Sequence, residues 1–166
     1  MLPHSNYKKK IKILITLLIV GLVLSGLTAF PLESELKFIS HHDSFLPVFL
    51  QDWLNNIYEA VKDTNTRYSY LSYGTDWLAF AHLVIAVVFV GPLRDPVKNI
   101  WVIQFGIISC VMVFFLALVA GPIRHIPVYW RLIDCSFGVG GLLLLVPCYR
   151  YIKKITPAIL PAKDGN

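Results

Sequence analysis

Apolar residues along the chain gather into four long runs separated by polar segments. The runs cover residues 11–30, 77–93, 100–121 and 132–149. A helix needs about 20 predominantly apolar residues to cross a bilayer, and the second and fourth runs are near the lower end of that length. Because lipid offers no hydrogen-bond partners, each run must satisfy its own backbone groups as a helix. The pattern therefore predicts four transmembrane helices.

The first run has a second interpretation. Basic residues precede it and small residues lie near Ala29, as in a cleaved signal peptide. Its apolar stretch of about 18 residues is longer than the 7–15 typical of signal peptides, and Leu27 fits poorly at a cleavage site. We therefore favour a retained helix, and cleavage would leave the threading of the other three unchanged.

The segment between the first two runs, residues 31–76, contains a helical pattern of its own. Large apolar residues recur at positions 50, 54, 57, 58 and 61, which fall on one face of a helix. This spacing predicts an amphipathic helix over residues 47–62 that lies on the membrane or covers the bundle. The aromatic residues that follow, from Tyr68 to Trp77, are typical of a membrane interface.

Composition supports the membrane assignment. Of the 166 residues, 56% are hydrophobic and 15% are charged, and the mean hydropathy is +0.63. Soluble domains carry about 25% charged residues. We therefore expect an all-α integral membrane protein in which residues 1–166 form one domain, a bundle of four transmembrane helices with an amphipathic helix in its first outer loop.

The basic residues predict the orientation of this bundle. Four of the fifteen Lys and Arg residues lie before or at the start of the first run, at positions 8, 9, 10 and 12. Two more lie between the second and third runs and four follow the fourth, so that ten share one side. Cytoplasmic loops carry the excess of Lys and Arg. Both termini are thus expected in the cytoplasm, with the protein in the plasma (inner) membrane. The formal net charge of +5 is then a topology signal, and nucleic-acid binding is not expected.

Few ionisable residues fall within or beside the apolar runs, and this threading places them in the outer half of the membrane. His82 is expected about 8 Å inside the outer end of its helix, and Asp134 about one turn deep. Intramembrane ionisable groups are commonly functional. The candidate ligand-binding residues are Asp76, His82, Arg124, His125, Arg131 and Asp134.

Residues 131–141 suggest how two of these candidates meet. Arg131, Asp134, Gly138 and Gly141 share one helical face, so Arg131 and Asp134 can pair along the helix. The two glycines allow a second helix to approach closely. Asp134 should therefore face the bundle, where His82 is its expected partner.

Metal and redox motifs are not expected from the sequence. The residues His41, His42 and Asp43 are adjacent in a loop and lack further ligands, so we interpret them as solvated. The three cysteines form no CxxC motif, and Cys135 and Cys148 are about 20 Å apart on one helix, too far for a disulfide. No metal site is predicted.

Three functions are compatible with this pattern. The favoured one is a small multi-pass membrane protein that binds a partner protein or a lipid-soluble ligand at the outer half of the bundle; membrane lipids, another membrane protein or a second copy of the chain are possible partners. The alternative is an enzyme acting on a lipid-like substrate, with His82 and Asp134 as an acid–base pair. The third is a haem- or quinone-linked redox protein, with haem held by His82 and His125. Architecture alone does not identify a cofactor or choose between these classes.

Overall fold

The computed structural model describes residues 3–42 and 45–159, with side chains for residues 6–42 and 45–156. The described part is helical and contains no strand. Four of its helical segments are long and apolar enough to cross a membrane: Asn6–Ala29, Ser69–Arg94, Ile100–Ile123 and Val128–Thr156. The predicted all-helical chain with four such segments is confirmed.

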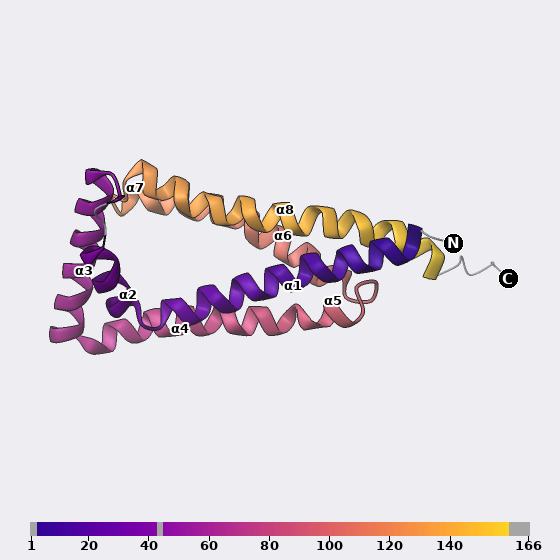
Figure 1. Cartoon of the computed structure of the whole chain (residues 1–166), viewed down its shortest axis with the longest axis horizontal. Coiled ribbons are helices and arrows are strands. Elements are labelled where there is room, and N and C mark those ends of the chain that lie inside the picture. The colour runs from indigo at the N-terminus through magenta and orange to yellow at the C-terminus, as the bar shows by residue number, and fades with distance from the viewer. Residues whose placement is uncertain (1–2, 43–44, 160–166) are drawn as a thin grey trace. The chain divides into compact units, whose positions relative to one another are not determined.

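The described helices follow one another with short connections (Figure 1). They are α1 (Pro3–Ala29), α2 (Leu32–His41), α3 (Val48–Arg67), α4 (Ser69–Val88), α5 (Val90–Arg94), α6 (Ile100–Phe115), the π-helical turn η2 (Leu116–Ala120), α7 (Gly121–Ile123) and α8 (Val128–Ile159). Helix α4 begins before its apolar run, at Ser69, and ends inside it, at Val88. Helix α8 extends beyond its run at both ends, because the helix continues through the polar and aromatic residues there.

The chain divides into two compact units. One consists of residues 1–20 and 87–166, and the other of residues 21–86. Helices α1 and α4 each contribute residues to both units. The sequence pattern contained no signal for this division, because apolar runs report burial or membrane depth and not which helices pack together.

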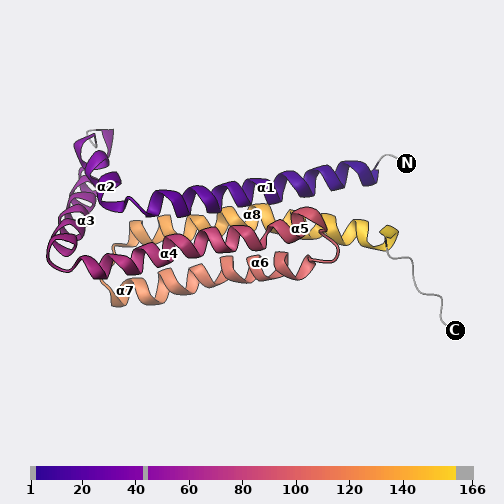
Figure 2. The same ribbon diagram turned by 90° about the horizontal axis from the view of Figure 1, so that it is seen from below.

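The unit of residues 1–20 and 87–166 is built around the packing of α6 on α8. Helix α6 continues through η2 into α7 as one rod (Figure 2). Two glycines of α8 bring this rod close. A Cβ added at Gly138 would lie 2.8 Å from the carbonyl oxygen of Cys110, and one added at Gly141 would overlap Cys110 Sγ. The predicted close approach at these glycines is therefore present, with α6 as the partner.

A third glycine opens space for the core of the same unit. A Cβ at Gly106 of α6 would lie 2.8 Å from the Phe89 ring and 2.9 Å from Leu145 Cδ1. Phe89 and Leu145 are both buried. The absence of a side chain at Gly106 thus lets a large aromatic ring and a leucine of α8 meet on the surface of α6.

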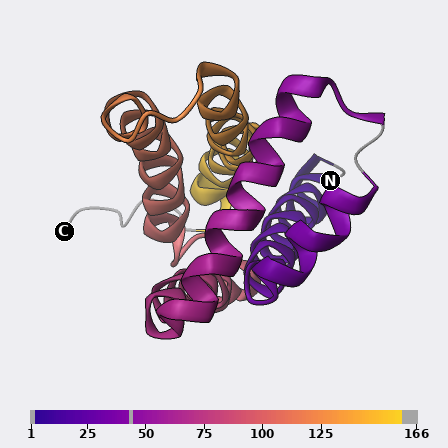
Figure 3. The same cartoon turned by 90° about the vertical axis from the view of Figure 1, so that its left-hand side faces the viewer.

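In the unit of residues 21–86, α2 packs against α3 (Figure 3). Each of the two helices buries one apolar side chain, Leu36 in α2 and Leu54 in α3. The end of α1 approaches α4 through Gly26, where a Cβ would lie 2.9 Å from the Ala79 carbonyl oxygen. This close approach leaves the ends of α1 and α4 beside the α2–α3 pair.

Helix α3 begins at Val48, one residue inside the range of 47–62 predicted for an amphipathic helix, and continues past that range to Arg67. The less exposed residues of α3 include Leu50, Trp53, Ile57 and Val61 beside the buried Leu54, whereas Asn55 and its neighbour Asn56 are exposed. This burial follows the helical spacing of the apolar residues. The relation of this face to a membrane is part of the proposed function below.

Candidate ligand-binding cavity

A cavity of about 460 Å³ lies within the unit of residues 21–86. Its walls come from the end of α1, the start of α2, the second half of α3 and the start of α4. A volume of this order is within the range that small-molecule sites occupy, about 300–1,000 Å³. The cavity therefore has space for a small ligand or for a few side chains of a partner.

Part of the cavity lining is apolar. Its lining includes the side chains of Phe30, Leu32, Ile57, Val61 and Leu71. Ile57 and Val61 are one turn apart on α3, so that the apolar face predicted from the helical spacing supplies part of this wall. The apolar wall favours a ligand with a hydrocarbon portion.

The lining also contains a chain of hydrogen bonds centred on Asn65 of α3. Asn65 Nδ2 donates to Glu33 Oε2 of α2 at 2.5 Å, and Ser72 Oγ of α4 donates to Asn65 Oδ1. One amide side chain thus joins three helices. Since the two ends of the amide act as donor and acceptor at once, this chain holds the cavity walls at a defined spacing.

The charge of the cavity lining is negative. Its two ionisable side chains are Glu33 and Asp76, and it contains no Lys, Arg or His. Glu33 is engaged by Asn65. Within the described part of the chain, Asp76 forms no hydrogen bond or ion pair, so its carboxylate is available to a ligand that carries a cation or a hydrogen-bond donor.

The structure places two of the six sequence-derived candidates in this unit. Asp76 lines the cavity, as just described. His82 lies further along α4 and is not part of the lining; its Nδ1 donates to the Leu78 carbonyl oxygen at 2.8 Å. A histidine in an apolar helix can thus satisfy one ring nitrogen on its own backbone, which leaves Nε2 as an acceptor.

The other four candidates, Arg124, His125, Arg131 and Asp134, belong to the second unit. His125 adopts a left-handed backbone conformation with φ of 56° in the turn between α7 and α8. The Arg131 side chain lies on Gly121, where a Cβ would lie 2.9 Å from Arg131 Cγ.

The predicted pairing along α8 is absent. No ion pair between Arg131 and Asp134 is found among the described residues, and Arg131 Nε is buried without a hydrogen-bond partner. The Arg131 side chain instead packs on Gly121, where the absence of a Cβ leaves room for its aliphatic part. The pairing of His82 with Asp134 stays a prediction, because these residues belong to different units.

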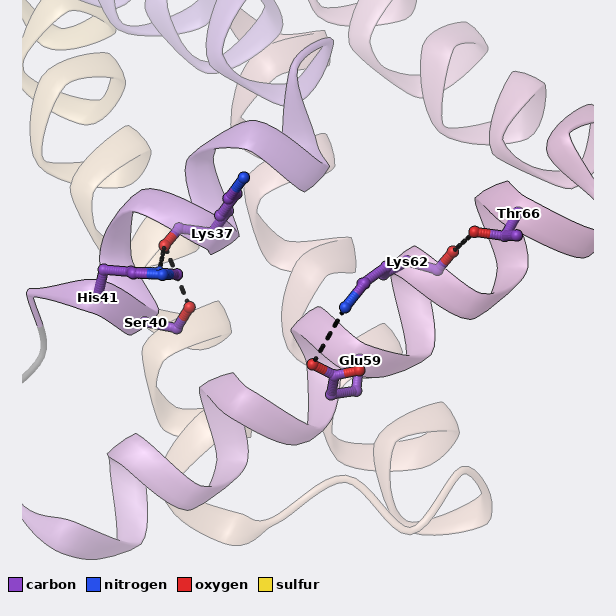
Figure 4. Close-up of polar contacts among 6 residues, drawn as sticks. All are labelled: Lys37, Ser40, His41, Glu59, Lys62 and Thr66. Atoms are coloured by element: carbon purple, nitrogen blue, oxygen red, sulfur yellow. Dashed lines mark hydrogen bonds and ion pairs between the residues drawn. The ribbon is translucent and has the colours of Figure 1, made fainter.

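The histidines of the "HHD" stretch bind their own helix. His41 Nδ1 donates to the Lys37 carbonyl oxygen at 2.7 Å, which also accepts from Ser40 Oγ (Figure 4). His42 Nδ1 donates to the Phe38 carbonyl oxygen at 2.9 Å. These bonds satisfy carbonyl groups at the end of α2. Asp43 lies outside the described residues, and no group of three or more potential metal ligands occurs among those described.

Sequence reasoning missed Glu33, Asn65 and Ser72. All three are polar residues in a segment where polar residues are expected, and their hydrogen bonds join positions as far as 32 residues apart. Only tertiary structure brings them together.

In comparisons with known proteins, no family matched the chain, and no curated protein or solved structure showed significant similarity to it.

Proposed function

We propose that the chain is a multi-pass membrane protein that binds an amphipathic ligand, or an amphipathic segment of a partner, in the cavity formed by α2, α3 and the start of α4. The observation that carries this proposal is the cavity itself, whose lining combines apolar side chains with two carboxylates. The proposal retains the favoured expectation from the sequence and moves its centre from His82 and Asp134 to Glu33, Asn65 and Asp76.

The same proposal includes a topology. Four apolar helices form a transmembrane bundle in the plasma membrane, with both termini in the cytoplasm and α2 and α3 outside. The support is the ten-to-five division of basic residues. Helix α3 would then lie at the outer membrane surface with its apolar face inward, and the cavity would open to ligands from the outer leaflet or the outer solution.

The ligand class follows from the lining. A carboxylate without a protein partner favours a cationic or hydrogen-bond-donating head, and the apolar wall favours a hydrocarbon body. A dansyl-labelled long-chain alkylammonium has both features and serves as the probe. The same probe with a neutral alcohol head tests how much of the binding depends on charge.

The test uses the full chain in phosphatidylcholine nanodiscs. The affinity of each probe is measured from the saturable change in its fluorescence on binding. Ala60→Phe places a ring in the cavity lining, whereas Asn56→Phe places the same ring one turn earlier on an exposed part of α3. We expect Ala60→Phe to weaken binding of the ammonium probe at least about tenfold, which corresponds to about 1.4 kcal/mol, and Asn56→Phe to leave it unchanged.

A second variant tests the charge. Asp76→Asn should weaken the ammonium probe about tenfold or more and leave the alcohol probe unaffected, because a hydrogen bond to a charged group contributes about 1.5–3 kcal/mol. Equal effects of the two phenylalanine variants, or equal binding of both probes to the wild type, would contradict the proposed site.

A further inference from the structure

A second feature lies in the other unit, where the start of α1 meets the end of α8. The rings of Tyr7 and Tyr151 are 5.3 Å apart between centroids. Lys10 Nζ lies 5.7 Å from the centre of the Tyr151 ring, and Lys154 Nζ lies 5.5 Å from that of Tyr7. Each helix thus places a lysine on the tyrosine of the other, and we name these four residues the tyrosine–lysine cluster.

More positive charge surrounds this cluster. Residues 6–15 and 149–156 contain seven Lys and Arg residues and no Asp or Glu. All seven are exposed. None of them takes part in an ion pair within the described part of the chain, where the three ion pairs involve Lys62, Arg67 and Lys98.

So many cations brought together by two helices repel one another unless an anion joins them. The cation–π contacts with Tyr7 and Tyr151 orient two of the lysines but do not neutralise them. Several ammonium groups at one place favour an anion that they can share. A phosphate group has this property, because it offers several strong acceptor oxygens.

The position of the cluster identifies the source of that phosphate. Tyr7 and Lys10 lie at the start of the segment Asn6–Ala29, and Lys154 lies at the end of Val128–Thr156, both of which are long and apolar enough to cross a membrane. Beside the cluster on the same two helices, Ile11, Ile15, Ile152 and Ile155 are fully buried. A ring of lysines above an apolar helix pair is placed at the depth of lipid headgroups.

We infer that the tyrosine–lysine cluster is a binding site for the headgroup of an anionic phospholipid. The phosphate lies between Lys10 and Lys154, and the acyl chains extend along the exposed apolar surface of α1 and α8. Tyr7 and Tyr151 lie at the boundary between the two, where amphipathic rings are favoured. This site is independent of the cavity between α2 and α3 and of any ligand bound there.

The experiment counts lipids bound to the full chain by native mass spectrometry, with dioleoyl phosphatidylglycerol compared with dioleoyl phosphatidylcholine. The variant Lys10→Gln/Lys154→Gln removes the two lysines of the cluster. The matched control Lys37→Gln/Lys62→Gln removes two exposed lysines from α2 and α3, so that the change in net charge is the same. The variant Lys10→Arg/Lys154→Arg retains the charge and reports whether substitution itself disturbs the fold.

We expect one phosphatidylglycerol to bind more tightly than any phosphatidylcholine. The Lys10→Gln/Lys154→Gln variant should lose about fivefold in affinity for each charge removed, and the control and the arginine variant should retain it. Equal losses in the cluster variant and its control would overturn the site, because net charge alone would then explain binding. Displacement of the lipid by inorganic phosphate would also overturn it and would assign the cluster to a soluble phosphate.

Discussion

Helices α6 and α8 approach each other closely where Cys110 lies on the glycines of α8. Adding a methyl group at Gly141 should push it against Cys110 Sγ. We expect Gly141→Ala to destabilise the protein by about 1–3 kcal/mol, as overpacking of a core does. A thermal unfolding curve in detergent measures the effect.

Two further variants separate overpacking from the intrinsic effect of alanine in a helix. Gly140→Ala adds the same methyl group on the same helix where no atom lies within 4 Å, and it should be neutral or stabilising. Combining Gly141→Ala with Cys110→Ala removes the colliding sulfur and should restore much of the lost stability. Additive effects of Gly141→Ala and Cys110→Ala would show that the two side chains are not in contact.

His82 is the predicted partner of Asp134. Its Nδ1 donates to the Leu78 carbonyl oxygen, so in the neutral imidazole Nε2 is the nitrogen left to accept a hydrogen bond from the carboxyl group of Asp134. We expect His82→Ala and Asp134→Asn to be coupled by about 0.6–2 kcal/mol, the range of hydrogen bonds between membrane helices. A double-mutant cycle of unfolding free energies measures this, and a coupling indistinguishable from zero would remove the pair.

At the scale of the element, α3 depends on a small apolar contact with its surroundings. Leu54 is its buried residue. Leu54→Asp should lower the free energy of unfolding by at least about 2 kcal/mol, because it removes an apolar side chain and places a carboxylate in an apolar contact. The control is Asn55→Asp at the next, exposed position. If hydrogen exchange of the α3 backbone were the same in both variants, α3 would not depend on this contact.

The elements themselves were predictable from the sequence to different degrees. The four apolar segments followed from run length, and α3 followed from the spacing of Leu50, Leu54, Ile57 and Val61. The ends of the helices could not be predicted in this way, because α4 begins in the polar and aromatic residues before Trp77 and α8 extends past Tyr149. Helix α2 was missed, since its mixed sequence "LESELKFISH" has no long apolar period.

Of the residues that form the candidate site, the sequence predicted only Asp76. Asp76 was selected because it lies at the outer edge of an apolar run, and it lines the cavity. Glu33, Asn65 and Ser72 could not be selected, because their chemistry arises from hydrogen bonds between three helices. The Arg131–Asp134 pair was wrong because helical spacing cannot report that Gly121 lies within reach of Arg131.

At the scale of the whole molecule, the proposed function depends on which side of the membrane α2 and α3 occupy. In the proposed topology, which the distribution of Lys and Arg supports, these two helices lie outside and the connection between α5 and α6 lies inside. If this orientation were reversed, the cavity would open to the cytoplasm and the tyrosine–lysine cluster would face the outer leaflet. The proposed ligand site would then open on the wrong side of the membrane.

The most direct test of this orientation labels single cysteines in intact cells with a membrane-impermeant maleimide. The three native cysteines are replaced by alanine, and one cysteine is introduced at exposed Asn55 of α3 or at exposed Lys98 between α5 and α6. We predict that the cysteine at position 55 reacts in intact cells and that the one at position 98 reacts only after lysis. Labelling of position 98 in intact cells with protection of position 55 would contradict the proposed topology and, with it, a ligand site that opens to the outside.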